Sequence, residues 1–353
     1  MMKGSPYIPQ ITASSLEGWL GKKNVQSTER FIFLVDEHVE DLHQLIQKLN
    51  GAVFTIKAGE EHKSISTVMK VWAFLGAQNA DRNTHIISIG GGVVSDLAGF
   101  VASTYMRGIG LSHIPTTLLA MVDAVLGGKT GINLSHWKNR VGTFYFPREI
   151  VLDLNFLHTL PREEWKNGWA EVLKHAIIDG DDLLTQVLSI HAVETCQSHC
   201  SYEFIRSVMQ VKVNCVQADV YDRSIRQKLN AGHTVGHALE SFFFLQGKRI
   251  HHGRAVAAGL WVEAEIAFMV NGLPAHQKRG LQTYIEEFFD LPLFSEKDIM
   301  IIRDYMKGDK KNRNFHIFFS LLYDWGDVRI NQRIEDTIIK DALRSYCNTL
   351  ENS

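Results

Sequence analysis

The chain has 353 residues, of which 45% are apolar and 22% charged, a composition that is typical of a globular protein and excludes a disordered or fibrous one. Its 37 basic and 39 acidic side chains give a formal net charge of -2. Because no overall positive field can attract nucleic acid or an anionic membrane, we expect neither as a partner. Any anionic ligand must be bound by a local cluster of cations.

The cysteine content and the N-terminal sequence favour a cytoplasmic protein. Four scattered cysteines are too few for a disulfide framework in a chain of this length, which fits a reducing compartment. The N-terminal sequence MMKGSPYIPQITASS lacks the apolar run of a secretory signal. The best candidate for a membrane span, residues 255–270, carries Glu263 and Glu265 and therefore does not predict one.

The first half of the chain alternates short apolar runs with helical patterns. Apolar runs predict buried strands over residues 31–36, 52–59 and 84–92. A 3.6-residue periodicity predicts helices over residues 38–50 and 64–79. Strands that alternate with helices predict a parallel sheet with crossover connections.

The second half of the chain has a different character. Helical patterns cover residues 161–179, 203–217 and 255–272, and a strand signal returns only at 316–330. No internal repeat or long flexible linker is visible. The sequence therefore predicts an α/β nucleotide-binding domain and a mostly α-helical domain, with the bounds 1–160 and 161–353.

A glycine-rich turn follows the third predicted strand. Gly90, Gly91 and Gly92 come just before an amphipathic helix, where backbone N–H groups can approach a pyrophosphate. Ser95 stands where the full dinucleotide fingerprint has its third glycine, so the turn alone also fits simple loop geometry. Two further anchors favour a nucleotide. They are Asp36 at a strand end and the pair Thr116 and Thr117 after another apparent strand.

The segment VDAVLGGKTGIN, residues 122–133, invites comparison with a phosphate-binding loop. That motif needs glycine where Asp123 stands, five residues before Gly128, so ATP hydrolysis is disfavoured. Lys129 after two glycines, with Lys138 and Asn139 further on, suits a phosphorylated substrate. A solvated basic loop is an equally good interpretation of these residues alone.

Histidines and carboxylates provide the strongest chemical signal. His233 and His237 lie four residues apart on one helical face, with Glu240 three residues further. A zincin protease needs glutamate directly after the first histidine, and Thr234 in that place makes protease chemistry unfavourable.

Two other segments could complete a metal site. WAEVLKH puts Glu171 and Lys174 on one face of an earlier helix, and HHGRAV supplies His251 and His252. Two histidines, one carboxylate and an open fourth position are what a catalytic zinc ion requires.

Together these blocks resemble the 3-dehydroquinate synthase family of the shikimate pathway, which belongs to aromatic amino acid and chorismate biosynthesis. The resemblance runs from Asp36 to Asn312, and the blocks that carry it are GGGVVSDLAGFVASTYMRG, IPTTLLAMVDAVLGGKTGIN, GWAEVLKHAIID, LNAGHTVGHALE, HGRAVAAG and DKKN. It implies a Rossmann-like N-terminal domain that binds NAD+ and a helical C-terminal domain that binds the metal and the substrate.

The resemblance also implies a role for individual residues. The metal, zinc or cobalt, would be bound by Glu171, His233 and His252. The substrate would be held by Lys129, Lys174, Lys212, Arg226, Asn230, His237, Asp123, Asn139, Lys310 and Lys311. NAD+ would be bound by Asp36, Glu60, Lys63, Gly91, Gly92, Asp96, Thr116, Thr117, Lys138 and Thr159. Arg107 matches an arginine that reaches the phosphate of the neighbouring subunit, which implies a homodimer.

The implied reaction converts 3-deoxy-D-arabino-heptulosonate 7-phosphate to 3-dehydroquinate and phosphate. It is a phosphate-eliminating lyase reaction in which NAD+ is a catalyst and is not consumed. The many cations in the implied site fit a doubly charged sugar acid, and the substrate phosphate itself would act as the base in the elimination.

Three positions depart from the family pattern and keep other functions open. Arg254 stands where the family usually has glutamate, and Asp222 is a shorter carboxylate than the usual glutamate. Ala231 stands where the family usually has phenylalanine. These changes concern substrate fit, so another sugar-phosphate cyclase is one alternative, and a noncatalytic metal-binding scaffold is another. A third alternative, a polyol dehydrogenase of the glycerol dehydrogenase type, leaves the implied phosphate cage around Lys129 and Arg226 without a purpose.

Overall fold

The computed structural model of the protein describes residues 9–26, 30–42, 51–134, 137–270, 272–307 and 316–351. Contacts within the chain divide it into two compact units, here called the first and the second unit. The first comprises Met1–Glu164 with Ser201–Met209, and the second Trp165–Cys200 with Gln210–Ser353. The expected division placed residues 201–209 in the C-terminal domain, whereas the contacts group them with the first unit.

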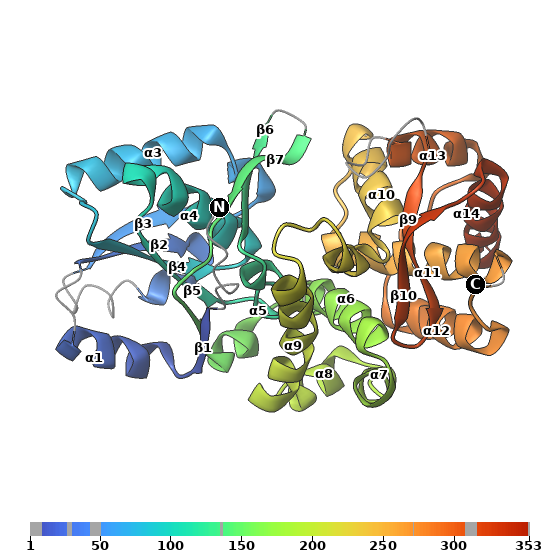
Figure 1. Ribbon diagram of the computed structural model, residues 1–353, viewed down its shortest axis with the longest axis horizontal. Coiled ribbons are helices and arrows are strands. Elements are labelled where there is room, and N and C mark those ends of the chain that lie inside the picture. The colour runs from blue at the N-terminus through green and yellow to red at the C-terminus, as the bar shows by residue number, and fades with distance from the viewer. Residues whose placement is uncertain are drawn as a thin grey trace. The chain divides into compact units, whose positions relative to one another are not determined.

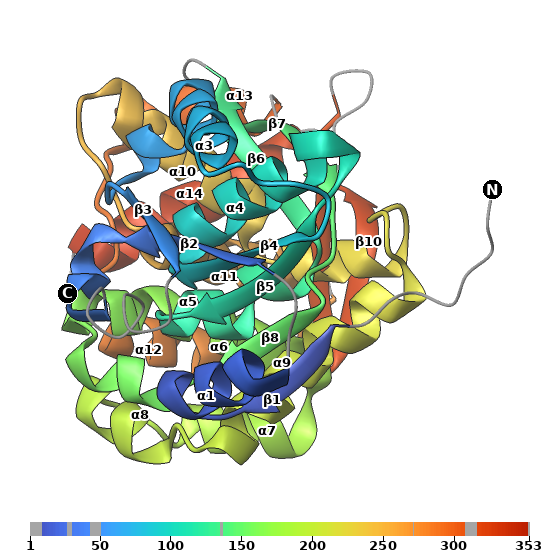
Figure 2. The same cartoon turned by 90° about the vertical axis from the view of Figure 1, so that its left-hand side faces the viewer.

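The first unit is built on a six-stranded parallel sheet, as the sequence predicts (Figure 2). The strand order is β1-β8-β5-β4-β2-β3. The strands are β1 (Gln10–Ala13), β2 (Arg30–Asp36), β3 (Ala52–Ile56), β4 (Thr84–Gly90), β5 (Gly110–Pro115) and β8 (Glu149–Leu152). The helices are α1 (Leu16–Gln26), α3 (Ile65–Ala77), α4 (Gly92–Thr104) and α5 (Leu118–Val122).

Both faces of this sheet are buried, which explains why its strands are continuous apolar runs. Along β2, Ile32 and Leu34 pack with α3 and α4 on one face. Phe33 and Val35 belong to a second cluster with residues of α1. Figure 1 shows α1 on the opposite side of the sheet from α3. Successive strand residues alternate between faces, so one apolar run contributes to two hydrophobic cores.

The order of the strands creates a switch point beside β2. The chain leaves β2 for its neighbour β3 and then crosses back to β4, which pairs with the opposite edge of β2. In open α/β sheets, ligands bind outside the carboxyl ends of the strands at such a point. Here those ends are Asp36 on β2 and Gly90 on β4.

The segment around Lys129 in the first unit has more regular structure than its sequence indicates. Residues around Lys129 fit a solvated basic loop on sequence grounds, but they form an antiparallel pair, β6 (Lys129–Leu134) and β7 (Trp137–Phe144). This pair packs on α4, where a Cβ atom at Gly99 would lie 2.5 Å from Cγ2 of Thr130. The helix predicted over 38–50 is in its first part a short 3₁₀ helix, Glu37–Leu42, and residues 43–50 lie outside the described ones.

The second unit is mostly helical, and the predicted fold class is confirmed. The segments predicted as helices at 161–179 and 203–217 are helical, although the contacts group residues 203–209 with the first unit. The helix predicted at 255–272 ends at Met269, and the strand signal at 316–330 marks a two-stranded antiparallel sheet. The elements are α6 (Arg162–Asp179), α7 (Asp181–Leu188), α8 (Val193–His199), α9 (Tyr202–Ala218), α10 (His233–Leu245), α11 (His252–Met269), α12 (Ala275–Phe288), α13 (Ile299–Lys307), α14 (Asp336–Glu351), β9 (Phe318–Asp324) and β10 (Asp327–Arg333).

Within the described residues, no helix is both long and apolar enough to traverse a lipid bilayer.

Candidate metal and nucleotide sites

Glycines bring the first turns of α10 and α11 together. A Cβ atom at Gly259 of α11 would lie 1.9 Å from the carbonyl oxygen of Gly232, so only glycine permits this approach of the two backbones. Gly232 directly precedes α10 and has a φ of +77°, in the left-handed region. The close crossing places His233, the first residue of α10, near His252, the first residue of α11.

A second close contact attaches the start of α11 to α6. A Cβ atom at Gly253 would lie 2.4 Å from the backbone oxygen of Asn167, and the Gly253 N–H donates to Asn167 Oδ1 at 2.6 Å. Asn167 lies four residues before Glu171, one turn earlier on α6. The three helices α6, α10 and α11 are thus packed so that Glu171, His233 and His252 meet.

These three side chains present one ligand atom each, and the three atoms lie within 4.8 Å of one another. Glu171 is fully buried, and its Oε1 lies 3.5 Å from His233 Nε2 and 3.3 Å from His252 Nε2. Lys174 forms an ion pair with Oε2 of the same carboxylate. A buried carboxylate beside two imidazole nitrogens fits a divalent ion such as Zn²⁺ or Co²⁺, with protein ligands on three sides.

The two histidines differ in their electrostatic surroundings. Burial and the positive charge of Lys174 hold the pKa of His233 well below its ordinary value, despite the opposing charge of Glu171. Burial also lowers the pKa of His252, but hydrogen bonds with Glu171 and Glu240 outweigh it and raise that pKa to about 10. His233 is therefore neutral near pH 7, whereas a metal ion must displace a proton from His252.

Three of the predicted substrate residues are buried cations of the second unit. Lys174, Lys212 and Arg226 are all less than a tenth exposed. Burial raises the pKa of the Cys215 thiol, and the positive charges of Lys228, Lys174, Arg226 and Lys212 oppose that rise. The assignment of these three residues to the substrate stays a prediction.

Two further predicted substrate residues lie at α10. His237 is exposed, and its ring centroid is 5.2 Å from that of His233 and 6.3 Å from that of His252. Asn230 lies just before the helix and donates from Nδ2 to the carbonyl of Gln227 at 3.1 Å. The predicted residues Lys310 and Lys311 lie outside the described residues.

The glycine turn of the first unit forms a cradle at the switch point. A Cβ atom at Gly91 would lie 3.3 Å from Cγ2 of Thr117, and one at Gly90 would lie 3.1 Å from Cβ of Asp36. The Thr116 N–H donates to the Gly90 carbonyl at 3.1 Å. The predicted nucleotide residues at the ends of β2, β4 and β5 are thus neighbours at the N-terminus of α4, and a helix N-terminus is a favourable place for a pyrophosphate.

A buried lysine lies on the other side of the same helix start. Lys63 is 4% exposed, and its Nζ is 2.5 Å from Oδ2 of Asp96 on α4. Burial lowers the pKa of Lys63, but the negative charges of Asp96 and Glu60 outweigh it, so this pKa is raised. Glu60, Lys63 and Asp96, all predicted for NAD+, therefore form one charged cluster.

The remaining predicted residues belong to the first unit. Lys129, Lys138 and Asn139 lie exposed on the β6–β7 pair, and Asp123 follows α5. Thr159 is exposed at the end of a 3₁₀ helix, Leu154–Thr159, and Arg107 at the end of another, Tyr105–Arg107.

The sequence does not reveal one buried carboxylate that supports the metal set. Glu263 of α11 is 3% exposed, and it accepts hydrogen bonds from the N–H groups of Gly232 at 2.7 Å and Val235 at 3.3 Å. It therefore caps the start of α10, the helix that begins at His233. The one sequence feature that could indicate this role is the negative charge of Glu263 inside a largely apolar helical run.

The three departures from the family pattern lie outside the set of metal ligands. The Arg254 guanidinium donates to the carbonyl of Asp290, whose carboxylate also accepts from Lys166 Nζ at 2.5 Å. Asp222 occupies a turn position with a φ of +57°. Ala231 is buried, and its carbonyl faces His233 Nδ1 at 3.1 Å.

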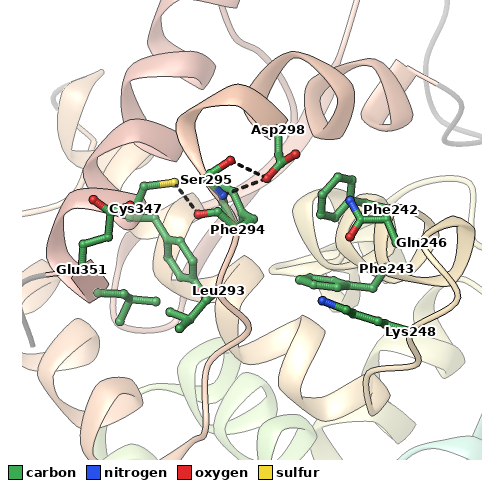
Figure 3. A pocket seen from close by; sticks show the side chains of 12 residues that line it. Phe242, Phe243, Gln246, Lys248, Leu293, Phe294, Ser295, Asp298, Cys347 and Glu351 are labelled. Carbon is green, nitrogen blue, oxygen red and sulfur yellow. Dashed lines mark hydrogen bonds between the residues drawn. The ribbon is translucent and has the colours of Figure 1, made fainter.

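A cavity of about 360 Å³ lies at the far end of α10 from His233 (Figure 3). Its walls include Phe242, Phe243, Phe294 and Tyr346, each less than a tenth exposed because they pack into the surrounding core. None of the predicted site residues lines this cavity.

Comparison with known proteins identifies the family. A model of the 3-dehydroquinate synthase N-terminal domain matches residues 53–167, and a model of the C-terminal domain matches residues 168–312. The chain belongs to the 3-dehydroquinate synthase family. A curated 3-dehydroquinate synthase from Pyrococcus abyssi (strain GE5 / Orsay) is 40% identical over 306 residues, which cover 85% of this chain and 87% of that protein. The family predicted from the sequence is confirmed.

Solved structures agree with this membership. A crystal structure of 2-deoxy-scyllo-inosose synthase with carbaglucose-6-phosphate, NAD+ and Co²⁺ superposes with a TM-score of 0.79 and 27% identity, covering 95% of this chain and 96% of that one. A 2-epi-5-epi-valiolone synthase from Streptomyces hygroscopicus subsp. jinggangensis 5008 superposes with a TM-score of 0.84 at 22% identity, covering 99% of each chain. At this identity, the second comparison shows only that this chain and the 2-epi-5-epi-valiolone synthase share a fold.

Proposed function

We propose that the protein is a phosphate-eliminating lyase that converts 3-deoxy-D-arabino-heptulosonate 7-phosphate to 3-dehydroquinate and phosphate. It uses NAD+ catalytically and binds Zn²⁺ or Co²⁺. The observation that carries the proposal is the meeting of Glu171, His233 and His252 within 4.8 Å, in a chain matched by both domain models of the family. The NAD+ and Co²⁺ bound to the solved 2-deoxy-scyllo-inosose synthase support the choice of cofactors.

The metal set prepares the substrate for oxidation. A divalent ion held by Glu171, His233 and His252 would polarise a substrate hydroxyl and so ease loss of its proton. The low pKa of His233 keeps its ring neutral and able to act as a ligand. Lys174, paired with Glu171, fixes the orientation of that carboxylate within the buried site.

The buried cations bind the anionic groups of the substrate. Lys174, Lys212 and Arg226 are three positive charges that are largely shielded from water, which strengthens their attraction for a phosphate or a carboxylate. Buried cations of this kind would let a chain with a net charge of -2 bind a strongly anionic sugar acid.

The first unit orients the nucleotide. Backbone N–H groups at Gly91 and Gly92 would hold the pyrophosphate at the start of α4, and Asp36 would accept hydrogen bonds from ribose hydroxyls. NAD+ bound there would supply a hydride acceptor and, once reduced, a hydride donor, so the whole reaction would involve no net oxidation.

We also propose a homodimer in which Arg107 of one protomer reaches the substrate phosphate bound by its partner. Met106 and Arg107 have φ values of 49° and 68°, and consecutive left-handed residues other than glycine are strained positions that concentrate at functional sites. Arg107 is exposed. Light scattering should give the mass of a dimer. Mixing inactive Arg107→Ala and His252→Ala chains should restore up to about a quarter of wild-type activity, because one site of each mixed dimer is complete.

Product analysis tests the reaction. The full-length protein is incubated with the heptulosonate phosphate, Zn²⁺ and NAD+, and the carbocycle and inorganic phosphate are quantified. Equal amounts of 3-dehydroquinate and phosphate support the proposal. Activity only with a different sugar phosphate would make the protein another cyclase, and NADH in amounts equal to the consumed substrate would make it a polyol dehydrogenase.

A further inference from the structure

The ring of His252 lies between two carboxylates from different helices. Its Nε2 faces Glu171 Oε1 on α6 at 3.3 Å, and its Nδ1 faces Glu240 Oε1 on α10 at 3.5 Å. The two nitrogens of an imidazole ring point in different directions, so these carboxylates lie at different edges of the ring. Only Glu171 belongs to the group of atoms that can share one metal ion.

Both metal-binding histidines follow the same pattern, but with different acceptors. His233 presents Nε2 to the metal set, and its Nδ1 lies 3.1 Å from the backbone carbonyl of Ala231. His252 also presents Nε2, and its Nδ1 faces the Glu240 side chain. A histidine ligand needs a proton on the nitrogen that does not bind the metal, and the acceptor of that proton fixes the ring and its tautomer.

The place of Glu240 in the fold suits this role. It lies seven residues after His233 on α10, two turns along the same helical face, and it is 9% exposed. His252 is the first residue of α11, and its side chain is 31% exposed. A ring at a helix start with this exposure is less constrained by packing than the buried Glu171, so a fixed hydrogen-bond partner matters more.

We propose that Glu240 is a positioning residue for metal binding, which accepts the Nδ1 proton of His252 and so directs the Nε2 lone pair to the metal. The proposal rests on the metal site of the proposed function. Glu240 acts through His252 and is not itself a ligand. A charged acceptor also increases the electron density of the imidazole, which strengthens the bond from Nε2 to the metal.

Metal titration of the full-length protein tests the proposal. The dissociation constants for Zn²⁺ and Co²⁺ are measured by chelator competition, and the visible spectrum of bound Co²⁺ reports its ligands. Glu240→Ala should weaken binding by about 10–100-fold, the usual effect of removing an outer partner of a histidine ligand. Glu240→Gln keeps an acceptor oxygen and the side-chain volume, so its loss should be smaller, with an unchanged Co²⁺ spectrum.

Glu265→Gln is the matched control. Glu265 is a buried carboxylate on α11, but its partners are Lys278 at 2.9 Å and Gln282 at 3.0 Å. This variant should bind metal with wild-type affinity. Metal affinity of Glu240→Ala within about twofold of wild type would overturn the proposal, as would equal losses in Glu240→Ala and Glu265→Gln. A Co²⁺ spectrum that changes coordination in Glu240→Gln would make Glu240 a ligand and also overturn it.

The wild-type titration separates this proposal from the proposed function. If the wild-type chain binds no stoichiometric metal ion, the metal site of the proposed function fails, and the role of Glu240 fails with it. If the wild type binds one ion and Glu240→Ala binds it equally well, only the role of Glu240 fails.

Discussion

The two candidate sites of this protein are built from different parts of the chain, one from side chains and the other mainly from backbone. In the second unit the metal set consists of side chains, Glu171, His233 and His252, carried by three helices. In the first unit the nucleotide cradle consists mainly of backbone, at the Gly90–Gly92 turn between β4 and α4. The positions of side-chain ligands depend on how closely their helices pack, whereas the shape of a backbone cradle depends on where adjacent strands end.

The difference predicts that the two sites fail in different ways. Removing a functional group should abolish the metal site, whereas adding atoms should block the nucleotide cradle. Close packing also makes the metal set sensitive to buried charges that never touch the metal, such as Glu263. The predictions that follow test this contrast.

The largest effect is expected for His252→Ala. Loss of one of three ligands should remove the stoichiometric metal and lower kcat/KM by roughly 1,000-fold or more. NAD+ affinity, a property of the first unit, should stay within about twofold of wild type. His251→Ala is the control, because His251 is exposed and lies outside the metal set. A metal-replete and active His252→Ala protein would show that the ligand assignment is wrong.

The reciprocal change is Gly91→Val. Its Cβ would already lie 3.3 Å from the Thr117 methyl group, and the valine methyls would occupy the space that a pyrophosphate needs. NAD+ affinity, measured by calorimetry, should fall roughly 10–100-fold while the metal content stays unchanged. In Gly76→Val the new Cβ meets nothing within 4 Å, so that variant should bind NAD+ normally. Unchanged NAD+ affinity in Gly91→Val would place the nucleotide elsewhere.

A smaller effect is expected for Glu263→Gln. The neutral amide replaces a charged acceptor of two backbone N–H groups at the start of α10, which should lower the free energy of unfolding by about 1–3 kcal/mol. Urea denaturation monitored by circular dichroism provides the measurement. The same change at Glu287, whose side chain is 58% exposed, should cost less than about 0.5 kcal/mol. Equal costs at the two positions would contradict the capping role.

The last effect, which is absent near pH 7 and appears only at acidic pH, concerns His113 in the sheet of the first unit. Burial lowers the pKa of His113 from 6.5 to about 3, and its Nδ1 lies 2.6 Å from Ser88 Oγ. Between pH 6.5 and 3, His113 is protonated in the unfolded chain but stays neutral in the folded chain. The stability that comes from keeping His113 neutral is therefore complete above pH 6.5 and is lost as the pH falls toward 3. His113→Gln should reduce the slope of unfolding free energy against pH in this window by up to about 1.4 kcal/mol per unit. An unchanged slope would show that His113 does not contribute.

The sequence predicts the elements whose pattern is local. The run that forms β2 is apolar from Phe31 to Val35, the run that forms β4 has only Ser88 between its isoleucines, and α6 has a helical pattern, so both kinds of element can be recognised without the fold. The β6–β7 pair has no such pattern, because most of β7 is exposed and the pair is held by contact with α4. Its strands depend on tertiary packing.

The same distinction applies to the site residues. His233, His252 and Glu171 attract attention because histidines and carboxylates in short motifs are typical of metal ligands. Glu240 and Glu263 contact residues that are distant in the sequence. Glu240 pairs with His252, 12 positions away, and Glu263 pairs with Gly232, 31 positions away. Such partnerships exist only after α10 and α11 have packed, so no local pattern predicts them.

The central claim is that a metal set in the second unit and a nucleotide cradle in the first serve one reaction without net oxidation. Its most direct test counts phosphate ions released for each NAD+ added, with the heptulosonate phosphate in large excess and nicotinamide absorbance recorded at the same time. The account predicts many phosphate ions for each NAD+ and no accumulation of NADH. One NADH formed for each substrate molecule consumed, or phosphate release that stops after one turnover of NAD+, would contradict it.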